Sequence, residues 1–396
     1  AYILGHSGAR LLCVGATEGD KAVAAAAECP DIEQLVWLAG GNASDTPAGM
    51  IPFGDLCSGG HYTDNPGIDA NAPAQIIYTS GTESAPKGAV LSHAAILWQY
   101  SACLIDAEIA EEDTTLHALP LFHCAQLDCF LGPALKAGGR NIITDDNTPA
   151  NLLRLLADEQ VSSFFAPPTV WISLLRSEHF DQSDLSALRK GYYGASIMPV
   201  EVMKEIHSRL PDIRLWNLYG QTEMAPMATI LKPADQLRKA GSAGRPARYT
   251  ETRVVDDEGR DVGVGEVGEV VHRSPQLLTE YYRDPERTAA AFEGGWFHSG
   301  DLGVMDSEGY LTIVDRKKDM IKTGGENVSS REVEEVIYQL PEVSEVAVIG
   351  LPHPHWVEAV TAVVVARDGC QVDPDAVIQH CAAQLGGFKV PKAVLV

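Results

Sequence analysis

Short apolar runs alternate with amphipathic stretches along the chain up to about residue 250. The runs at residues 35–38, 75–78, 141–144 and 163–166 are typical of buried strands, and the stretches between them repeat apolar residues at helical spacing. Alternation of this kind predicts an α/β fold in which layered, mostly parallel sheets are covered by helices.

The pattern changes between residues 251 and 271, where pairs of β-branched residues are separated by Asp-Asp-Glu-Gly and Gly-Glu turns. This arrangement predicts antiparallel hairpins that form a small β-barrel-like subdomain or an added sheet.

A separate strand and helix pattern begins after Arg316. Ser329 lies three residues before Glu332, which is the spacing of a capping box at the start of a helix. Two strand-like runs, at 345–349 and 359–365, and a second helix follow. We therefore predict a large domain over residues 1–316 and a small mobile α+β domain over residues 317–396, joined at the charged stretch 315–319.

Composition narrows the choice of partners. The 54 acidic residues outnumber the 30 basic ones and give a net charge of -24, which repels nucleic-acid phosphates and anionic membranes. The eight cysteines form no CxxC pairs, a usage that favours reduced thiols. No uncharged apolar run has the length of a membrane helix. We expect a cytoplasmic protein without a transmembrane segment that does not bind nucleic acid; a homodimer is left open.

The stretch "YTSGTESAPKG" at residues 78–88 combines hydroxyl groups, glycine and one lysine. Backbone N–H groups in a Gly-rich turn, with hydroxyls and a lysine nearby, can bind phosphate oxygens. Lys87 precedes Gly88, however, so the stretch is not a Walker A loop, which disfavours a GTPase or a P-loop kinase. Taken alone, it is equally well explained as a polar turn between a strand and a helix.

Three further blocks follow in order: "LWNLYGQTE", "GWFHSGD" and "VDRKKDMIKTGGENVSSREVEE". Together with the first, they resemble the adenylate-forming superfamily of acyl-CoA synthetases, adenylation domains and luciferases, from residue 75 to the end. The resemblance implies an ATP- and Mg²⁺-dependent acyl-CoA synthetase that converts a carboxylic acid to an acyl-adenylate, releases pyrophosphate and transfers the acyl group to coenzyme A.

The resemblance also assigns roles to residues of the large domain. The β- and γ-phosphates would be held by Thr79, Ser80, Gly81, Thr82 and Lys87. Thr222 would contact the α-phosphate, and Glu223 would ligate Mg²⁺. The remaining contacts would be made to adenine by Gly194, Ala195, Ser196, Asn217, Tyr219 and Gly220, and to the ribose by Asp301 and Arg316. Alone, each residue is also explained by a place in the core, on a solvated face or in a turn.

In the small domain, the resemblance implies a hinge at Lys318. Lys322 would face the adenylate and Gly325 the pantetheine tunnel after the domain rotates for thioester formation.

One position departs from the family, which usually has Thr-Gly where this chain has Glu83 and Ser84. A carboxylate about 4 Å from a phosphate would cost roughly 4 kcal/mol at an effective dielectric near 20. We therefore expect Glu83 to point away from the phosphates or to lie near the metal.

His123 lies in an aromatic-His block that, by the resemblance, gates the path of the carboxylate. A structural histidine is the main alternative, and a metal site with Cys124 and Cys129 is disfavoured by their spacing.

The acid pocket is expected to have an apolar lining without a buried charge. Its candidate residues are Trp171, Tyr192, Met224 and Met227. This lining favours a medium- or long-chain fatty acid, then an aryl or steroid-side-chain acid, and disfavours an amino acid.

The adenylating lysine of the family belongs to a Pro-x-x-x-x-Gly-Lys block, and neither Lys389 nor Lys392 has that context. We therefore expect both ends of the chain to be incomplete. Three functions stay open: an acyl-CoA ligase, a fatty-acyl-AMP ligase that loads a carrier protein, and a non-catalytic adenylate-binding protein.

Overall fold

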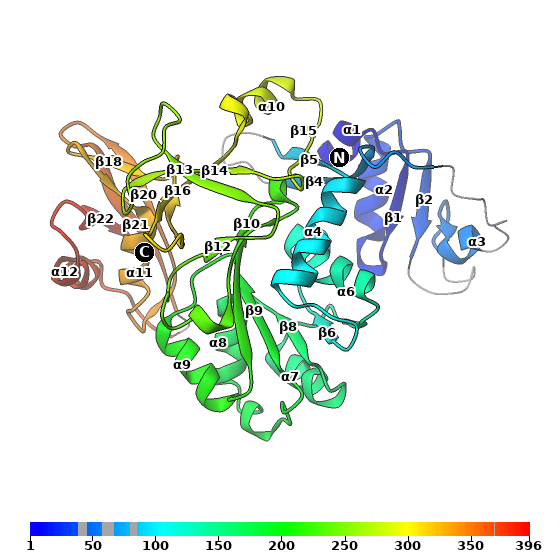
Figure 1. Ribbon diagram of the computed structural model, residues 1–396, viewed down its shortest axis with the longest axis horizontal. Coiled ribbons are helices and arrows are strands. Elements are labelled where there is room, and N and C mark those ends of the chain that lie inside the picture. Colours follow the sequence, from blue (N-terminus) through cyan, green and yellow to red (C-terminus); the bar gives the residue numbers. More distant parts are fainter. Residues whose placement is uncertain (39–45, 58–66, 80–84, 368) are drawn as a thin grey trace.

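The computed structural model describes residues 1–38, 46–57, 67–79, 85–367 and 369–396 (Figure 1). Its largest sheet has seven strands in the order β12-β11-β10-β9-β8-β6-β7. The strands are β6 (Thr114–His117), β7 (Arg140–Ile143), β8 (Ser163–Phe165), β9 (Lys190–Gly194), β10 (Arg214–Gly220), β11 (Met227–Leu231) and β12 (Arg245–Pro246). From β7 to β10 neighbouring strands are parallel, whereas β11 and β12 are antiparallel to their neighbours, so the predicted α/β sheet is confirmed.

Helices cover both faces of this sheet because successive strand residues point to opposite sides. Phe164 packs with the helices of one face, which are α7 (Pro149–Asp158), α8 (Pro168–Arg176) and α9 (Val200–Arg209). Its neighbour Phe165 packs with those of the other, which are α4 (His93–Asp106), the π-helical turn η3 (Leu127–Leu131) and α6 (Gly132–Ala137). The short helix α5 (Cys124–Gln126) leads into η3, and the 3₁₀ turn η4 (Phe180–Gln182) follows α8.

Two three-stranded sheets extend the large domain. One is parallel and is formed by β1 (Leu11–Val14), β2 (Gln34–Trp37) and β3 (Ile51–Pro52). It is accompanied by α1 (Tyr2–Ser7), η1 (Ala16–Glu18), α2 (Gly19–Ala27) and α3 (Phe53–Cys57). The other is antiparallel, in the order β15-β5-β4, and is formed by β4 (Pro73–Thr79), β5 (Lys87–Ser92) and β15 (Glu280–Tyr281). The pairing of β15 with β5 brings Tyr281 opposite Ala89.

A four-stranded antiparallel sheet, in the order β13-β14-β16-β17, confirms the predicted hairpins. Its strands are β13 (Glu251–Val255), β14 (Val267–Arg273), β16 (Phe297–Met305) and β17 (Leu311–Arg316). The segment between β15 and β16 contains α10 (Pro285–Ala291) and η7 (Glu293–Gly295), and the turns η5 (Thr222–Met224) and η6 (Pro233–Asp235) flank β11.

The C-terminal sheet has the order β19-β18-β21-β20, with β22 paired to β21 (Figure 1, orange to red). Its elements are β18 (Ile321–Thr323), β19 (Glu326–Val328), α11 (Ser330–Ile337), β20 (Val343–His353), β21 (Val357–Ala366), α12 (Pro374–Gln384) and β22 (Ala393–Leu395). The predicted boundary at 316/317 falls between β17 and β18, and the division into two domains stays a prediction.

The predicted capping box of α11 is half formed. Ser329 Oγ accepts a hydrogen bond from the backbone N–H of Glu332 at 3.2 Å. The Glu332 carboxylate instead accepts from Lys389 Nζ at 2.7 Å. The helix start is therefore stabilised by the serine cap, while Glu332 ties α11 to the segment after α12.

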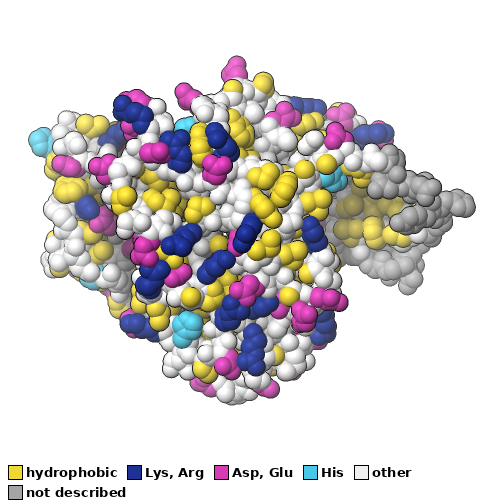
Figure 2. All heavy atoms as spheres, viewed as in Figure 1, with side chains coloured by type: hydrophobic (Ala, Val, Ile, Leu, Met, Phe, Trp, Pro, Cys, Tyr) yellow, Lys and Arg dark blue, Asp and Glu magenta, His cyan; other side chains and the backbone are white. Residues whose placement is uncertain are grey.

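The acidic excess does not give a uniformly acidic surface. On the face seen in Figure 2, Lys and Arg side chains lie among Asp and Glu side chains. Several charged side chains of the molecule are paired, for example Arg214 with Glu108 at 2.6 Å. Within the part of the chain that the structure describes, every helix is too short or too polar to span a bilayer.

Candidate active site

A cavity of about 1380 Å³ opens at the carboxyl ends of β9 and β10, where they meet β5, β16 and the connection between β17 and β18. Most of the residues predicted from the sequence line it: Thr79, Lys87, His123, Gly194, Ala195, Ser196, Asn217, Tyr219, Gly220, Thr222, Glu223, Asp301, Arg316 and Lys318. These residues come from segments that are far apart in the sequence, so the fold brings the four blocks to one place.

The remaining predicted residues fall into two groups. Ser80, Gly81, Thr82 and the unusual Glu83 lie outside the described residues, so the phosphate loop and the orientation of Glu83 stay predictions. Lys322 lies in β18 and Gly325 in the turn between β18 and β19, and neither residue lines the cavity.

One side of the cavity carries a paired cation and anion. Lys87 Nζ lies 3.0 Å from Glu223 Oε1. Tyr281 Oη, which is buried between them, donates to the same Glu223 oxygen at 2.8 Å and accepts from Lys87 Nζ at 2.9 Å. Burial and the nearby Glu223 carboxylate raise the pKa of Tyr281, so its hydroxyl stays a donor at neutral pH.

Two hydroxyl groups lie on the same side. Thr222 Oγ1 is 3.2 Å from Cys124 Sγ, and burial raises the pKa of that thiol to about 12, which keeps it protonated. Thr79 Oγ1 is buried and has no hydrogen-bond partner among the described residues. A buried hydroxyl without a partner is uncommon, and here it lines a cavity that a polar ligand can fill.

The opposite side of the cavity centres on a buried carboxylate. Tyr219 Oη donates to Asp301 Oδ2 at 2.6 Å, and Arg316 Nε lies 2.8 Å from Asp301 Oδ1. Burial raises the pKa of Asp301, while the Arg316 guanidinium and the Tyr219 hydroxyl oppose that rise. Asp301 is thus held in a fixed orientation with acceptor capacity at the cavity.

The wall between these two sides is made by closely spaced backbone. A Cβ atom at Gly194 would lie 2.5 Å from the carbonyl oxygen of Leu218, and Ala195 has φ +65°. Asn217 Nδ2 donates to the carbonyl oxygen of Ser242 at 3.0 Å, which fixes the amide at the edge of the cavity. Only a glycine allows β9 and β10 to approach this closely at position 194.

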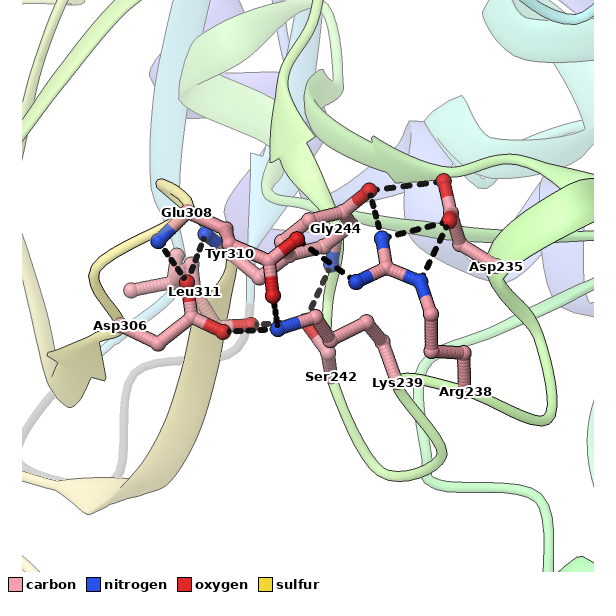
Figure 3. Close-up of polar contacts among 9 residues, drawn as sticks. All are labelled: Asp235, Arg238, Lys239, Ser242, Gly244, Asp306, Glu308, Tyr310 and Leu311. Atoms are coloured by element: carbon pink, nitrogen blue, oxygen red, sulfur yellow. Dashed lines mark hydrogen bonds and ion pairs between the residues drawn. The ribbon is translucent and has the colours of Figure 1, made fainter.

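The segment that contains Ser242 is held in turn by the β16–β17 hairpin (Figure 3). Ser242 Oγ donates to the carbonyl oxygen of Leu311 at 2.7 Å, and the N–H of Leu311 donates to the carbonyl oxygen of Gly244 at 2.8 Å. Beside these bonds, Lys239 lies within ion-pair distance of both Asp306 and Glu308, at 2.6 and 2.5 Å. The network fixes the cavity edge from outside the cavity.

His123 lies at the mouth of the cavity next to the exposed Phe122. Its Nδ1 accepts a hydrogen bond from the backbone N–H of Ala125 at 3.1 Å and so caps α5. The structural role that the sequence left open is therefore present, and a gating role stays a prediction. In the part of the chain that the structure describes, no group of three or more His, Cys, Asp or Glu residues could hold a metal.

One part of the cavity lining is apolar and belongs to a single packed cluster, formed by Cys129, Phe130, Phe165, Leu218 and Met227. We call this part the acid slot. Of the four lining residues predicted from the sequence, only Met227 lines it.

The prediction was wrong for Trp171, Tyr192 and Met224, which are packed into the cores around the cavity. Trp171 Nε1 donates to the carbonyl oxygen of Tyr192 at 3.1 Å, and Tyr192 Oη donates to the carbonyl oxygen of Ala107 at 2.7 Å. An apolar pattern predicts burial, but it does not distinguish contact with a core from contact with a void.

Sequence reasoning missed Tyr281. It lies 194 residues after Lys87 and outside the four sequence blocks, and the pairing of β15 with β5 brings the two residues together.

Comparisons with known proteins agree with this arrangement. The sequence pattern of the family described as AMP-binding enzyme matches residues 1–282, and that of the AMP-binding enzyme C-terminal domain matches residues 332–396. The chain is 36% identical over 351 residues to an indoleacetate–CoA ligase of Aromatoleum aromaticum. This match covers 88% of the chain and 68% of that protein. It is 36% identical over 362 residues to a feruloyl-CoA synthase of Amycolatopsis, covering 91% and 72%.

A third relative is the long-chain-fatty-acid–CoA ligase FadD13 of Mycobacterium tuberculosis, which is 38% identical over 335 residues, covering 84% of the chain and 65% of that protein. Among solved structures, ATP-bound MatB from Rhodopseudomonas palustris superposes with a TM-score of 0.85 at 30% identity, covering 100% of this chain and 76% of that one. The anthranilate CoA ligase AuaEII in complex with anthranoyl-AMP superposes with a TM-score of 0.87 at 25% identity, covering 100% and 75%.

Proposed function

Because the chain belongs to the AMP-binding enzyme family, we propose that it is an ATP-dependent acid–CoA ligase that forms an acyl-adenylate and passes the acyl group to coenzyme A. The relatives named above are acid–CoA ligases or synthetases, which is the AMP-forming class expected from the sequence. The observation that carries the proposal is a single cavity with the Lys87–Glu223 pair at one end and an apolar slot at the other.

ATP fits the charged end. Two anions, the carboxylate and the triphosphate, must meet in the reaction, so the site has to offset negative charge. Lys87 would contact the phosphates, Thr222 the α-phosphate, and the unpartnered Thr79 hydroxyl a further phosphate oxygen. Asp301 would accept from the ribose hydroxyls, since Arg316 and Tyr219 hold it in place.

Magnesium also fits this end. Mg²⁺ in nucleotide sites is usually bound by one or two carboxylates together with phosphate oxygens. Glu223 supplies a carboxylate beside Lys87 in the cavity lining. When bound, the ion would offset charge on the phosphate oxygens. Tyr281 would help to hold the Glu223 carboxylate for such a role through its 2.8 Å hydrogen bond.

The adenine would lie between Tyr219 and the Gly194–Ala195–Ser196 segment, with Asn217 at its edge. For the thioester step we propose the division into residues 1–316 and 317–396, with a hinge at Lys318 that would bring Lys322 and Gly325 to the cavity. Such a rotation lets one site carry out two half-reactions. A cytoplasmic location and a homodimer stay predictions.

The acid must have an apolar body, because the slot is lined by aromatic, aliphatic and sulfur-containing side chains. The sequence favoured a medium- or long-chain fatty acid. The names of the relatives include both aromatic and long-chain acids. They therefore support the assignment to the acid–CoA ligases, but they do not decide between an aromatic and a long-chain substrate.

The test is acid-dependent exchange of pyrophosphate into ATP, followed by measurement of AMP and thioester after addition of coenzyme A. Exchange together with thioester formation supports the proposal. Exchange without thioester indicates an acyl-AMP ligase that uses another acceptor, and nucleotide binding without exchange indicates a non-catalytic protein. Glu223→Gln is the control for adventitious exchange, since it should abolish the signal. Its melting temperature is measured alongside, because the change leaves Lys87 without its partner charge.

A further inference from the structure

The acid slot ends in a layer of packed rings. The centroids of Phe130 and Phe165 are 4.3 Å apart and their planes differ by 15°, so the two rings stack. Behind them, Tyr192 lies 5.0 Å from Phe130, and Trp216 lies 5.0 Å from Tyr192. All four side chains are buried in the core between the sheet and α4. Because protein interiors are close-packed, this layer closes the slot.

The depth of the slot follows from the strand register. Phe165 is the Cα partner of Tyr192 on β9, and Gly194, at the adenine wall, lies two residues further along the same strand. With a rise of about 3.3 Å per residue, the floor lies roughly 7 Å below that wall. One aromatic ring with a short arm fits this depth, whereas an extended chain of the length of palmitate is far longer.

The wall at the top of the slot is as fixed as its floor. Gly194 pairs with Leu218 across the two strands, and a Cβ atom at position 194 would lie 2.5 Å from the Leu218 carbonyl oxygen. A longer acid therefore cannot gain depth by separating these strands without breaking the sheet pairing.

The chemistry of the walls favours a ring over a short aliphatic chain. Phe130 and Phe165 offer aromatic surface, and aromatic pairs are favourable beyond the area that they bury. Met227 and Cys129 add sulfur atoms, which also make favourable contacts with rings. No side chain of the slot as defined above carries a formal charge, so the carboxylate of the acid belongs at the mouth, beside Thr222.

We propose that the acid is compact, with its carboxylate joined through a short arm to a single aromatic ring, and that Phe165 sets the limit on its length. This inference rests on the proposed ligase function and narrows it: arylacetic and cinnamic acids are expected substrates, in place of the medium- or long-chain fatty acids that the sequence favoured.

The first experiment compares phenylacetate, cinnamate, octanoate and palmitate in the exchange assay with the unaltered protein. The two aryl acids should exceed palmitate in kcat/KM by about tenfold or more, the discrimination that a misfit of even one methylene can give in an apolar pocket. A palmitate value equal to or above those of the aryl acids overturns the inference while leaving the ligase function intact. If none of the acids drives exchange and ATP does not bind, the proposed function itself fails.

The second experiment changes the floor. Phe165→Leu shortens one floor residue without leaving a polar group, and should raise the ratio of octanoate to phenylacetate kcat/KM by about tenfold. Phe164→Leu is the matched control, because Phe164 is also buried but packs against Trp171 on the other face of the sheet. It should lower stability by a similar amount and leave the ratio unchanged.

Equal ratios in the two variants contradict the role of Phe165. If Phe165→Leu does not fold, the comparison of acids with the unaltered protein still decides the substrate class.

Discussion

Lys87 Nζ and Glu223 Oε1 lie 3.0 Å apart, so the cation and the carboxylate on the phosphate side of the cavity form an ion pair. The Lys87 side chain is 27% exposed and that of Glu223 only 6%, which shields the pair from solvent. Tyr281 bonds to both partners. Removing one member of a shielded pair leaves the other charge uncompensated and destabilises the fold. A conservative change at Tyr281 keeps both charges, so its effect on activity is easier to separate from an effect on stability.

Tyr281→Phe should lower the apparent affinity of the protein for Mg²⁺. The change removes only the hydroxyl that holds Glu223 Oε1 at 2.8 Å. Hydrogen bonds to charged groups contribute roughly 1.5–3 kcal/mol, so the Mg²⁺ concentration for half-maximal exchange should rise about tenfold or more. The measurement is the initial rate of pyrophosphate exchange as Mg²⁺ is varied at saturating ATP.

Tyr282→Phe is the control for this prediction, because Tyr282 is the next residue but its ring lies against His6 outside the cavity. It should leave the Mg²⁺ dependence unchanged. If Tyr281→Phe alters only the maximal rate, with the same Mg²⁺ midpoint, then Tyr281 does not position the carboxylate.

Asp301→Asn should weaken ATP binding more than it slows the chemical step. The carboxylate accepts from Tyr219 and pairs with Arg316, and an amide can satisfy only one of them as an acceptor. We expect the KM for ATP to rise about tenfold, since a charge-assisted hydrogen bond to the ribose is lost as well. Steady-state kinetics at saturating acid measure the two parameters separately.

The control for this change is Asp257→Asn, which neutralises an exposed carboxylate paired with Lys317. Because Asp257 does not line the cavity, its replacement should leave the KM for ATP unchanged. A fall in kcat with constant KM in Asp301→Asn would contradict a binding role for Asp301.

Gly220→Ala should disrupt the turn that carries Thr222 and Glu223. A Cβ atom at position 220 would lie 1.7 Å from the carbonyl oxygen of Pro226, which is backbone and cannot rotate away. Forcing a methyl group into a filled space costs about 1–3 kcal/mol, so the melting temperature and the exchange rate should both fall. Gly15→Ala is the control, since its Cβ would have no atom within 4 Å. Equal melting temperatures for the two variants would show that the turn adapts.

The sequence predicted the elements whose signals are local. The strand-like runs became β2, β4, β7 and β8, because short apolar runs bounded by turns favour strands. Of these, β2, β7 and β8 pair in parallel as predicted, whereas β4 lies in an antiparallel sheet. Helix α11 begins where Ser329 caps it. The charged residues of the site were found because each belongs to a block that is contiguous in the sequence.

The parts that the sequence did not predict depend on contacts between distant residues. Tyr281 joins the site only through the pairing of β15 with β5. Phe164 and Phe165 are identical in type and adjacent, yet one packs in a core and the other lines the slot. Trp171, which lies in α8, was wrongly assigned to the pocket because the assembled fold decides which face of a helix or strand meets a void.

Asp128 provides a test of stability against pH. It is fully buried in η3, where Gln75 Nε2 donates to Oδ2 at 2.9 Å and Tyr100 Oη donates to Oδ1 at 3.3 Å. Burial raises its pKa from 3.8 to about 6, and the two hydrogen bonds only partly oppose that rise. The folded protein therefore holds this proton more tightly than the unfolded chain does.

The sign of the pH effect follows from this difference. The stabilising contribution is fully present below pH 3.8 and is lost as the pH rises through about 6, because the folded protein must then bury a charge. The rise in pKa corresponds to roughly 3 kcal/mol at neutral pH.

The Asn side chain of Asp128→Asn cannot ionise. The free energy of unfolding of this variant, minus that of the unaltered protein, should therefore increase by up to about 3 kcal/mol as the pH rises from 4 to 8. Melting temperatures of both proteins across this range check the prediction, and comparing the two cancels the titration of all other groups. Asp31→Asn, at an exposed position, should give a profile parallel to that of the unaltered protein. A parallel profile for Asp128→Asn as well would mean that Asp128 ionises as easily in the folded chain as in water.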